Sequence, residues 1–368
     1  LICLRMAWQE PFPTANSRRM KFTRADGTKV DADFMADVRL ADTVCVDDPR
    51  LAQFSHTNAL QVAFHLKKLK NVTLDFRGAT VRLHGRIQPF LLDECENVRI
   101  VGVNVLYDRS PFTQGEIVRV GDGRLELKID RKRFPYAVEN GDLVFTSETW
   151  ETRGLDVRPQ FIQFFDGKTR RGVGSRLTLV GRAPKLDPKF PWAGSTILFT
   201  ARDEGDRLVL TSDNLRGLEK TIGPGALAVF GHEDRDLSNC RMLCCRNVTL
   251  KDYRILNGFG MGVFPIRCEN VTLEGLKMTC DERSPGVVAN CADGVHAIAC
   301  SGDFILRDSV IEGTIDDALN VHGNFLKLKA ANGTCLTADT CLELGGATPV
   351  VRPGDRLRVY RGLTTAPA

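Results

Sequence analysis

Two short stretches in the C-terminal half of the sequence combine aspartates with histidines, residue types that carry general acid–base chemistry. Residues 292–299 read ADGVHAIA, and residues 314–323 read TIDDALNVHG. The adjacent pair Asp316–Asp317 is unusual in a β-forming stretch, because like charges repel and aspartate is a poor strand former. The cost of placing such a pair there indicates that these residues serve a function.

The two stretches come into register when Asp293 is aligned with Asp317. Side chains alternate along a strand, so this alignment predicts that His296, Asn320 and His322 lie together on the outer face. The same alignment pairs Val295 with Leu319 and Ala297 with Val321, and it predicts that these apolar side chains point into the core.

Asp293, Asp316 and Asp317 form a three-carboxylate site if the adjacent pair lies at a corner or bulge, because a straight strand turns neighbours to opposite sides. Such a group suits inverting hydrolysis of a glycosidic bond. One carboxylic acid protonates the leaving oxygen, and a carboxylate roughly 6.5–9.5 Å away activates a water on the opposite face of the sugar. Each motif alone is more typical of a solvated turn. The two motifs lie one coil apart and are flanked by histidines, and this combination favours a catalytic site over two unrelated turns.

Four further residues are candidates for binding a substrate. His296 and His322 lie beside the carboxylates and could hydrogen-bond sugar hydroxyls. Asn320 either contacts the ligand or caps a turn. Arg267 directly precedes Cys268, and by alternation its side chain is expected to point outward, where it could reach a substrate.

A repeat that begins with Asn-Val-Thr-Leu, or a close variant, indicates which elements position these residues. Copies start at Asn71, Asn97, Asn247 and Asn270, and a diverged copy starts at Asp303. Units of roughly 20 to 30 residues with β-branched alternation and polar corners are typical of a solenoid. The LxxLxLxxN pattern of leucine-rich repeats is missing. We therefore predict an all-β fold, a right-handed parallel β-helix.

The cysteines support this prediction. Twelve are present without zinc-ligand spacing, and Cys95, Cys245 and Cys268 each lie two residues before a copy of the repeat. Equivalent positions in a β-helix stack about 4.8 Å apart, which predicts a small apolar column of thiols inside the coil. A disulfide between Cys245 and Cys268 is the geometrically possible alternative.

Two stretches interrupt the repeat. Between the second and third copies, short strand-like runs such as GRLELKI and GDLVFTS alternate with turns, the pattern of a small antiparallel barrel or sandwich. A similar pattern of short strand-like runs and turns returns after residue 323 and stops at the chain end. We therefore expect this sequence to be a fragment of a longer protein. The predicted units are a capping segment at 1–60, first coils at 61–110, an inserted β-barrel at 111–230, catalytic coils at 231–325 and the start of a second β-barrel at 326–368.

Around the candidate site the sequence resembles glycoside hydrolase family 110, the α-1,3-galactosidases, within the wider polygalacturonase-like group. The likeness is carried by residues 246–275, by CADGVHAIACSG at 291–302 and by TIDDALNVHG at 314–323. It extends from about residue 70 to the end of the chain. The resemblance implies a β-helix with inserted barrels that removes terminal α-linked galactose with inversion, without a metal or other cofactor.

The resemblance also implies catalytic roles. The family carboxylates map onto Asp293, Asp316 and Asp317. By analogy with polygalacturonases, Asp316 is the acid and the other two hold the water, while the alternative with Asp317 as the acid stays open. The Gly-His-Gly and Arg-Ile-Lys elements of polygalacturonases are missing, which argues against a uronic acid substrate.

Composition and charge bear on the partners. The net charge of +4 comes from 50 basic and 46 acidic residues, and a nucleic-acid binder is expected to concentrate its basic residues on one face. No apolar run approaches the ~20 residues needed to cross a membrane. We therefore expect a carbohydrate partner, no nucleic acid and no membrane. We also expect a secreted or periplasmic location, although the sequence shows no signal peptide.

Two other functions stay open. A pectin-type β-helix enzyme, such as a polysaccharide lyase, needs a base for the C5 proton and usually calcium. No acidic calcium cluster is conspicuous in the sequence. A non-catalytic carbohydrate-binding β-helix predicts aromatic platforms along the coils, where this sequence is mostly aliphatic.

Overall fold

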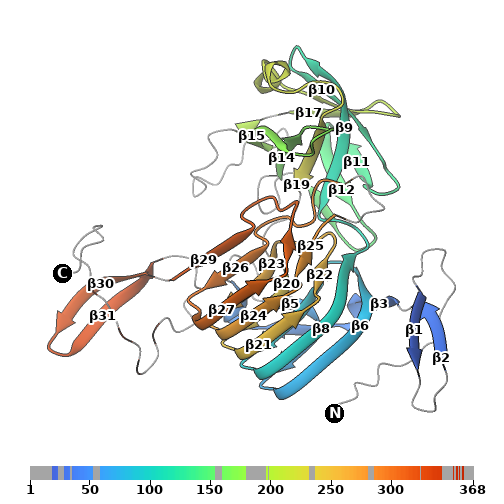
Figure 1. Ribbon diagram of the computed structural model, residues 1–368. Coiled ribbons are helices and arrows are strands. Elements are labelled where there is room, and N and C mark those ends of the chain that lie inside the picture. The colour runs from blue at the N-terminus through green and yellow to red at the C-terminus, as the bar shows by residue number, and fades with distance from the viewer. Residues whose placement is uncertain are drawn as a thin grey trace.

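The computed structural model describes residues 19–23, 29–33, 35–52, 59–153, 160–179, 196–197, 199–231, 237–280, 286–323 and 325–341, together with residues 351, 354, 356 and 359. Nearly all regular structure in these ranges is β-strand. Figure 1 shows a stack of parallel strands with a second group of strands above it. No helix in the described part is long and apolar enough to cross a membrane.

Two sheets form the stack, and the chain alternates between them. The seven-stranded sheet contains β4 (Val44–Asp47), β5 (Ala59–Lys67), β7 (Gln88–Asp93), β20 (Ser238–Leu243), β23 (Met261–Ile266), β26 (Val295–Ile298) and β29 (Leu319–His322). The nine-stranded sheet contains β3 (Met35–Arg39), β6 (Lys70–His84), β8 (Glu96–Tyr107), β21 (Arg246–Lys251), β22 (Arg254–Ile255), β24 (Glu269–Glu274), β25 (Lys277–Met278), β27 (Ser301–Arg307) and β28 (Val310–Ile311).

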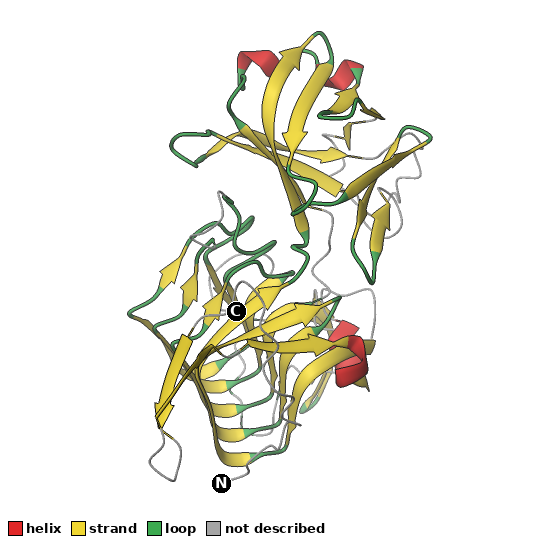
Figure 2. Ribbon diagram, turned by 90° about the vertical axis from the view of Figure 1, so that its right-hand side faces the viewer, coloured by secondary structure: helices red, strands yellow, loops and turns green. Residues whose placement is uncertain are grey.

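This alternation is the predicted parallel β-helix, and Figure 2 shows its strands and corners stacked as successive rungs. Strand pairing within the stack is parallel; only β4, at the N-terminal edge, runs antiparallel to its neighbour. The right-handed sense of the coil stays a prediction from the strong preference of parallel crossovers for that hand. The predicted all-β fold with a coiled parallel sheet is confirmed.

The stacking register survives the long interruption of the repeat. Phe90 on β7 pairs with Cys240 on β20, although all of the chain from β8 to β19 separates them in the sequence. Cys240 then pairs with Val263 on β23, which follows only one turn of the coil later. The chain between β8 and β20 is therefore an insertion that leaves and re-enters the stack at the same rung position.

The asparagine that begins each repeat turns a corner of the coil. Asn71, Asn97, Asn247 and Asn270 all have a positive φ, between 54° and 57°, a conformation that asparagine tolerates better than most residues. Their side-chain amides form a ladder in which each Nδ2 donates to the Oδ1 of the preceding rung, at 2.9, 2.8 and 2.9 Å. Asparagine therefore suits this corner in two ways: it tolerates the positive φ, and its side-chain amide bonds to the equivalent amide of the neighbouring rung.

The thiol column lies inside the coil, as the alignment predicted. Cys95, Cys245 and Cys268 are buried, and the amide of Cys95 donates to Sγ of Cys245 at 3.4 Å. Cys300 continues the column one rung further, next to Ser301, which pairs with Glu269. All four are free cysteines, so the alternative of a disulfide is wrong. Burial raises the pKa of the Cys268 thiol, which makes it an unreactive apolar group.

The insertion folds into a separate set of strands with its own core. An eight-stranded sheet contains β9 (Phe112–Gly121), β10 (Arg124–Ile129), β14 (Gln160–Phe165), β15 (Gly172–Leu179), β16 (Thr196–Ile197), β17 (Thr200–Asp203), β18 (Leu208–Thr211) and β19 (Leu227–Gly231). A three-stranded sheet contains β11 (Tyr136–Glu139), β12 (Asp142–Thr146) and β13 (Glu151–Arg153). All pairings except β15 with β16 are antiparallel. Two short 3-10 helices, η4 (Asp213–Leu215) and η5 (Leu218–Lys220), follow β18.

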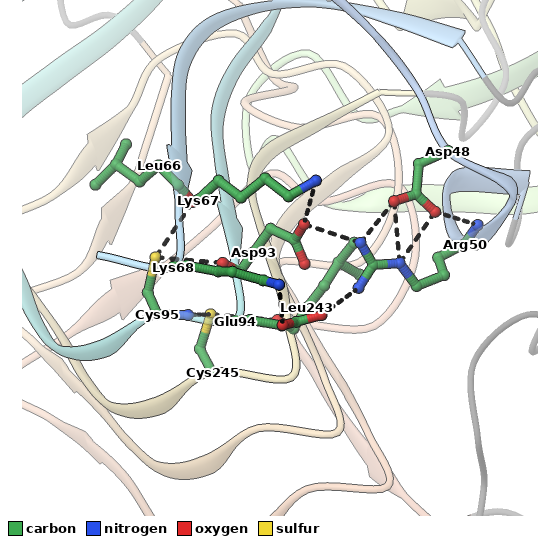
Figure 3. A network of polar contacts seen from close by, with 10 residues as sticks. All are labelled: Asp48, Arg50, Leu66, Lys67, Lys68, Asp93, Glu94, Cys95, Leu243 and Cys245. Atoms are coloured by element: carbon green, nitrogen blue, oxygen red, sulfur yellow. Dashed lines mark hydrogen bonds and ion pairs between the residues drawn. The ribbon is translucent and has the colours of Figure 1, made fainter. Parts of the chain in front are cut away.

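The N-terminal segment is fastened to the outer side of the first coils. After η1 (Leu40–Asp42) and β4, the 3-10 helix η2 (Pro49–Ala52) carries Arg50, whose Nη2 lies 2.6 Å from Asp48 and 2.8 Å from Asp93 on β7. Figure 3 shows this network, in which Lys67 on β5 also reaches Asp93. The hydrogen bond with Arg50 lowers the pKa of Asp48.

Two hairpins lie near the chain ends. At the N-terminus β1 (Arg19–Thr23) pairs with β2 (Lys29–Asp33), and at the C-terminus β30 (Phe325–Asn332) pairs with β31 (Cys335–Cys341). The C-terminal hairpin extends away from the stack (Figure 1). Residues 1–18 and 342–350, and most of 352–368, lie outside the described part. The second barrel therefore stays a prediction, and the regular structure described in its range is the hairpin of β30 and β31.

Candidate active site

The two aspartate-containing stretches lie on adjacent rungs in the predicted register. On β26 and β29, Val295 pairs with Leu319 and His296 pairs with Asn320. The amide of Gly294 donates to the Asp317 carbonyl at 2.8 Å, so the backbone of Asp317 lies directly beside that of Asp293. The sequence alignment is therefore confirmed, and the three candidate carboxylates belong to consecutive coils.

The adjacent aspartates lie where the chain turns before β29. Residues 314–318 form bends and one isolated bridge rather than a strand, and Thr314 Oγ1 donates to the Asp316 carbonyl at 2.9 Å. Asp316 and Asp317 are both exposed, whereas Ile315 is buried. The irregular backbone thus turns both carboxylates toward solvent, which the sequence required of a three-carboxylate site.

Asp293 differs from the other two carboxylates in its burial. Its side chain is 2% exposed, and a buried charge is stable only with a partner. Nδ1 of His296 lies 2.6 Å from Oδ2 of Asp293. The site therefore combines one enclosed carboxylate with two that face water.

A buried asparagine holds the loop that carries Asp293. The side-chain amide of Asn290 donates to the carbonyls of Gly260, Ala292 and Asp293 at 2.9, 3.2 and 2.9 Å. Its Oδ1 accepts from Nδ2 of Asn239 on β20 at 3.1 Å. Sequence reasoning missed Asn290, because its partners are carbonyl groups and a side chain on a distant strand. A single asparagine outside the repeat gave no signal.

Gly294 is required for the close approach of the two rungs. A Cβ at this position would lie 2.6 Å from Cγ2 of Ile311 and 2.7 Å from the Ala318 carbonyl oxygen. Both distances are shorter than any normal contact. The glycine after Asp293 therefore serves packing between coils, and the Asp-Gly sequence is not a solvated turn.

The two histidines lie side by side, and His296 is more enclosed than the sequence indicated. His296 lies on the outer side of the sheet, but it is 3% exposed and its ring lies 5.5 Å from that of Phe264. Its Nε2 is 2.8 Å from Nε2 of His322, and Nδ1 of His322 is 2.9 Å from the Gly323 carbonyl oxygen. Nδ1 of His296 lies 2.6 Å from Oδ2 of Asp293, but this contact does not have the geometry of a hydrogen bond. Contact of either ring with a sugar stays a prediction.

Two apolar residues and one arginine also differ from expectation. Val295 and Ala297 are fully buried, but Leu319 and Val321 are 44% and 54% exposed. β29 is the last strand of the sheet in the described part, so no further coil covers them there. Arg267, expected to point outward, is 5% exposed and lies at a corner with a φ of 52°. Asn320 is half-buried on β29, and its contact with a ligand stays a prediction.

The inserted domain supports the site loops from one side. Val287, Val288, Cys291 and Ile315 pack in the hydrophobic core of the insertion rather than in that of the coil. The amide of Val287 donates to Oε1 of Gln114 on β9 at 2.9 Å. The segments just before Asp293 and Asp316 are thus anchored to the insertion, a role that its sequence pattern did not reveal.

Comparison with known proteins agrees with this architecture. A family described as GLAA-B beta-barrel domain I matches residues 113–174, inside the insertion. An alpha-1,3-galactosidase B of Akkermansia muciniphila is 27% identical over 310 residues, which are 83% of this chain and 36% of that protein.

Two further relatives show the same relationship. An alpha-1,3-galactosidase B of Bacteroides thetaiotaomicron is 25% identical over 71% of this chain and 40% of its own length. An alpha-1,3-galactosidase A of Shewanella woodyi is 24% identical over 73% of this chain and 41% of its own length. The chain therefore spans 36–41% of the length of these three relatives. Together with the motifs at the aspartates, these matches support the resemblance to glycoside hydrolase family 110.

Proposed function

We propose that the protein is an inverting exo-glycoside hydrolase that removes terminal α-1,3-linked galactose from oligosaccharides or glycans. The observation that carries this proposal is the stacking of Asp293 beneath Asp317, with Asp316 beside it at the same bend. Carboxylates on adjacent rungs can flank one sugar, as hydrolysis by direct displacement requires.

The environments of the carboxylates support a division of roles. Asp316 faces solvent, where it can donate a proton to the leaving oxygen and regain one from water. Asp293 is enclosed and paired with His296, which suits a carboxylate that orients water and accepts its proton. Asp317, one rung from Asp293, is the second residue that holds the water.

The substrate class rests on the relatives, which are named alpha-1,3-galactosidases. Attack by water on the face opposite the leaving group converts an α-galactoside into β-galactose. An enzyme that releases a single galactose acts at chain ends, so exo action belongs to the same proposal.

The test is incubation of the purified protein with 4-nitrophenyl α-galactoside and with an oligosaccharide that ends in α-1,3-linked galactose. The variants Asp316→Asn and Asp293→Asn remove one proposed catalytic carboxylate each. Asp206→Asn is the matched control, because this side chain is 76% exposed on the insertion. We expect galactose release by wild type and the control, and a loss of roughly 10²–10⁴-fold in kcat in the two catalytic variants.

Other outcomes decide between the alternatives. Galactose release at an equal rate by all four proteins would exclude the proposed carboxylates. Unsaturated or uronic acid products from pectin would indicate a pectin-type enzyme. Glycan binding without any turnover would indicate a carbohydrate-binding protein.

A further inference from the structure

Ile315 is the buried residue at the start of the bend that carries Asp316 and Asp317. Its side chain is 8% exposed, whereas both aspartates face solvent. In a straight strand, neighbouring side chains point to opposite faces, so Asp317 would point the same way as Ile315. The two aspartates face solvent together because the chain bends over residues 314–318. Whatever holds this bend in place therefore also places the two carboxylates.

Backbone hydrogen bonds join the bend to the preceding rung. The amide of Ile315 donates to the Asn290 carbonyl at 3.1 Å, and the Asp317 carbonyl accepts from the Gly294 amide at 2.8 Å. These bonds fix the height of the bend above the rung that carries Asp293. They do not fix the direction of the Ile315 side chain, which depends on what that side chain packs against.

The side chain of Ile315 belongs to the hydrophobic core of the insertion. That core also contains Phe112 on β9, Phe161 on β14 and Phe230 on β19, all of them far from Ile315 in the sequence. A β-branched side chain has few rotamers open to it, and a close-packed core leaves it little room to move. The insertion therefore holds the bend through this side chain.

The segment that leads to Asp293 is attached to the same core. Val287 and Cys291 belong to this core. The amide of Val287 donates to Oε1 of Gln114 at 2.9 Å, and Sγ of Cys291 donates to the Pro111 carbonyl at 3.5 Å. Both segments that carry candidate carboxylates are thus attached to one hydrophobic core, so the insertion can set their relative position.

We propose that Ile315 is a positioning residue through which the inserted domain sets the direction of Asp316 and Asp317, an inference that rests on the proposed hydrolase function. Because Ile315 is buried, it acts on the reaction through the backbone that carries the aspartates. A carboxylic acid and the carboxylates that hold the water must keep their mutual geometry, since a misplacement of about 1 Å can cost roughly 10²-fold in rate. The insertion is thereby part of the catalytic geometry.

Two matched substitutions test this role. Ile222 belongs to the same core and is 5% exposed. Its amide bonds to Leu218 on η5, and the helices of the insertion lie at the end away from the coils (red at the top of Figure 2). Ile315→Ala and Ile222→Ala remove the same atoms from one core, so we expect similar decreases in Tm. We expect Ile315→Ala to lower kcat roughly 10–100-fold with little change in KM, and Ile222→Ala to keep the wild-type kcat.

Amide hydrogen exchange tests the positioning without any activity. The Gly294 amide donates to the Asp317 carbonyl, so its exchange reports how firmly the bend is paired with the neighbouring rung. We expect this amide to exchange faster in Ile315→Ala than in wild type and in Ile222→Ala. Loss of a core contact elsewhere in the insertion should leave the pairing intact.

Equal results in the two variants would overturn the proposal, whether the equal quantity is kcat or the exchange rate of the Gly294 amide. The Arg246 amide, which donates to the Cys95 carbonyl at 2.8 Å, is the internal reference and should exchange alike in all proteins. An inactive wild type would refute the proposed hydrolase function, and the exchange result would still decide whether Ile315 positions the bend. If Ile315→Ala does not fold, Ile315→Val and Ile222→Val are compared in the same way.

Discussion

Gly294→Ala adds one methyl group where two rungs of the β-helix are closest. The new Cβ would lie 2.6 Å from Cγ2 of Ile311 and 2.7 Å from the Ala318 carbonyl oxygen, about 1 Å inside normal van der Waals separation. A backbone carbonyl cannot rotate away as a flexible side chain can. The rung that carries Asp293 must therefore move relative to the rung that carries Asp317.

The expected cost has two parts. Overpacking of this kind costs about 1–3 kcal/mol, which corresponds to a decrease in Tm of roughly 2–10 °C for a chain of this size. A displacement of several tenths of an ångström between the proposed catalytic carboxylates is expected to lower kcat/KM by about 10- to 100-fold. Both quantities are measured on the same preparation, by calorimetry and with 4-nitrophenyl α-galactoside.

Gly223→Ala is the matched control for this prediction. A Cβ at Gly223 has no heavy atom within 4 Å, so Tm and kcat/KM are expected to stay close to wild type. If Gly294→Ala keeps both the wild-type Tm and the wild-type kcat/KM, the reasoning about the rung spacing is refuted. If Tm falls and kcat/KM does not, the spacing matters for stability but not for the placement of Asp293.

Three further predictions concern the supports of the site and of the coil. Asn290→Ala removes a donor from three carbonyls, of which the Asp293 carbonyl keeps the Gly262 amide at 2.8 Å. We expect a loss of about 2–5 kcal/mol in unfolding free energy and a lower kcat. An unchanged midpoint of urea unfolding would show that the loop does not depend on the Asn290 side chain. Asn247→Ala is expected to be less stable than Asn247→Gly by about 1 kcal/mol, because only glycine adopts the observed φ of 54° without strain; equal midpoints would contradict this. Glu274 has its pKa lowered to about 2 by hydrogen bonds from Arg307 and Lys251. Its contribution to stability is therefore complete above the unfolded pKa of roughly 4.5 and is lost as the pH falls toward 2. Glu274→Gln should be less stable than wild type at pH 6 and approach it at pH 2, and a difference that grows toward pH 2 would contradict the sign.

The repetitive features of the fold could be predicted from the sequence, because each rung repeats the same physical demand. The corner occupied by Asn97 needs a positive φ and an amide for the ladder, and the position of Cys245 needs a small apolar side chain inside the coil. These demands recur at nearly constant spacing. The same spacing predicted the register of Asp293 with Asp317, which the pairing of β26 and β29 confirms.

The features that sequence reasoning missed depend on contacts between distant parts of the chain. The outer face of the coil was expected to be open to solvent, but Arg241 donates to the Leu51 carbonyl, far away in the sequence, and His296 on the same face is buried. Ile315 packs against the core of the insertion, which no local pattern indicates. Leu319 is exposed because β29 is an edge strand in the described part, whereas the alternation rule assumes that a neighbouring coil covers it.

The anomeric form of the first product tests the central claim most directly. Hydrolysis of an α-1,3-linked galactoside is followed by ¹H NMR from the first minutes, before mutarotation equilibrates the sugar. Direct displacement by a water held at Asp293 and Asp317, with Asp316 as the acid, predicts that β-galactose appears first and that Asp316→Asn abolishes its formation. The appearance of α-galactose as the first product would contradict the account.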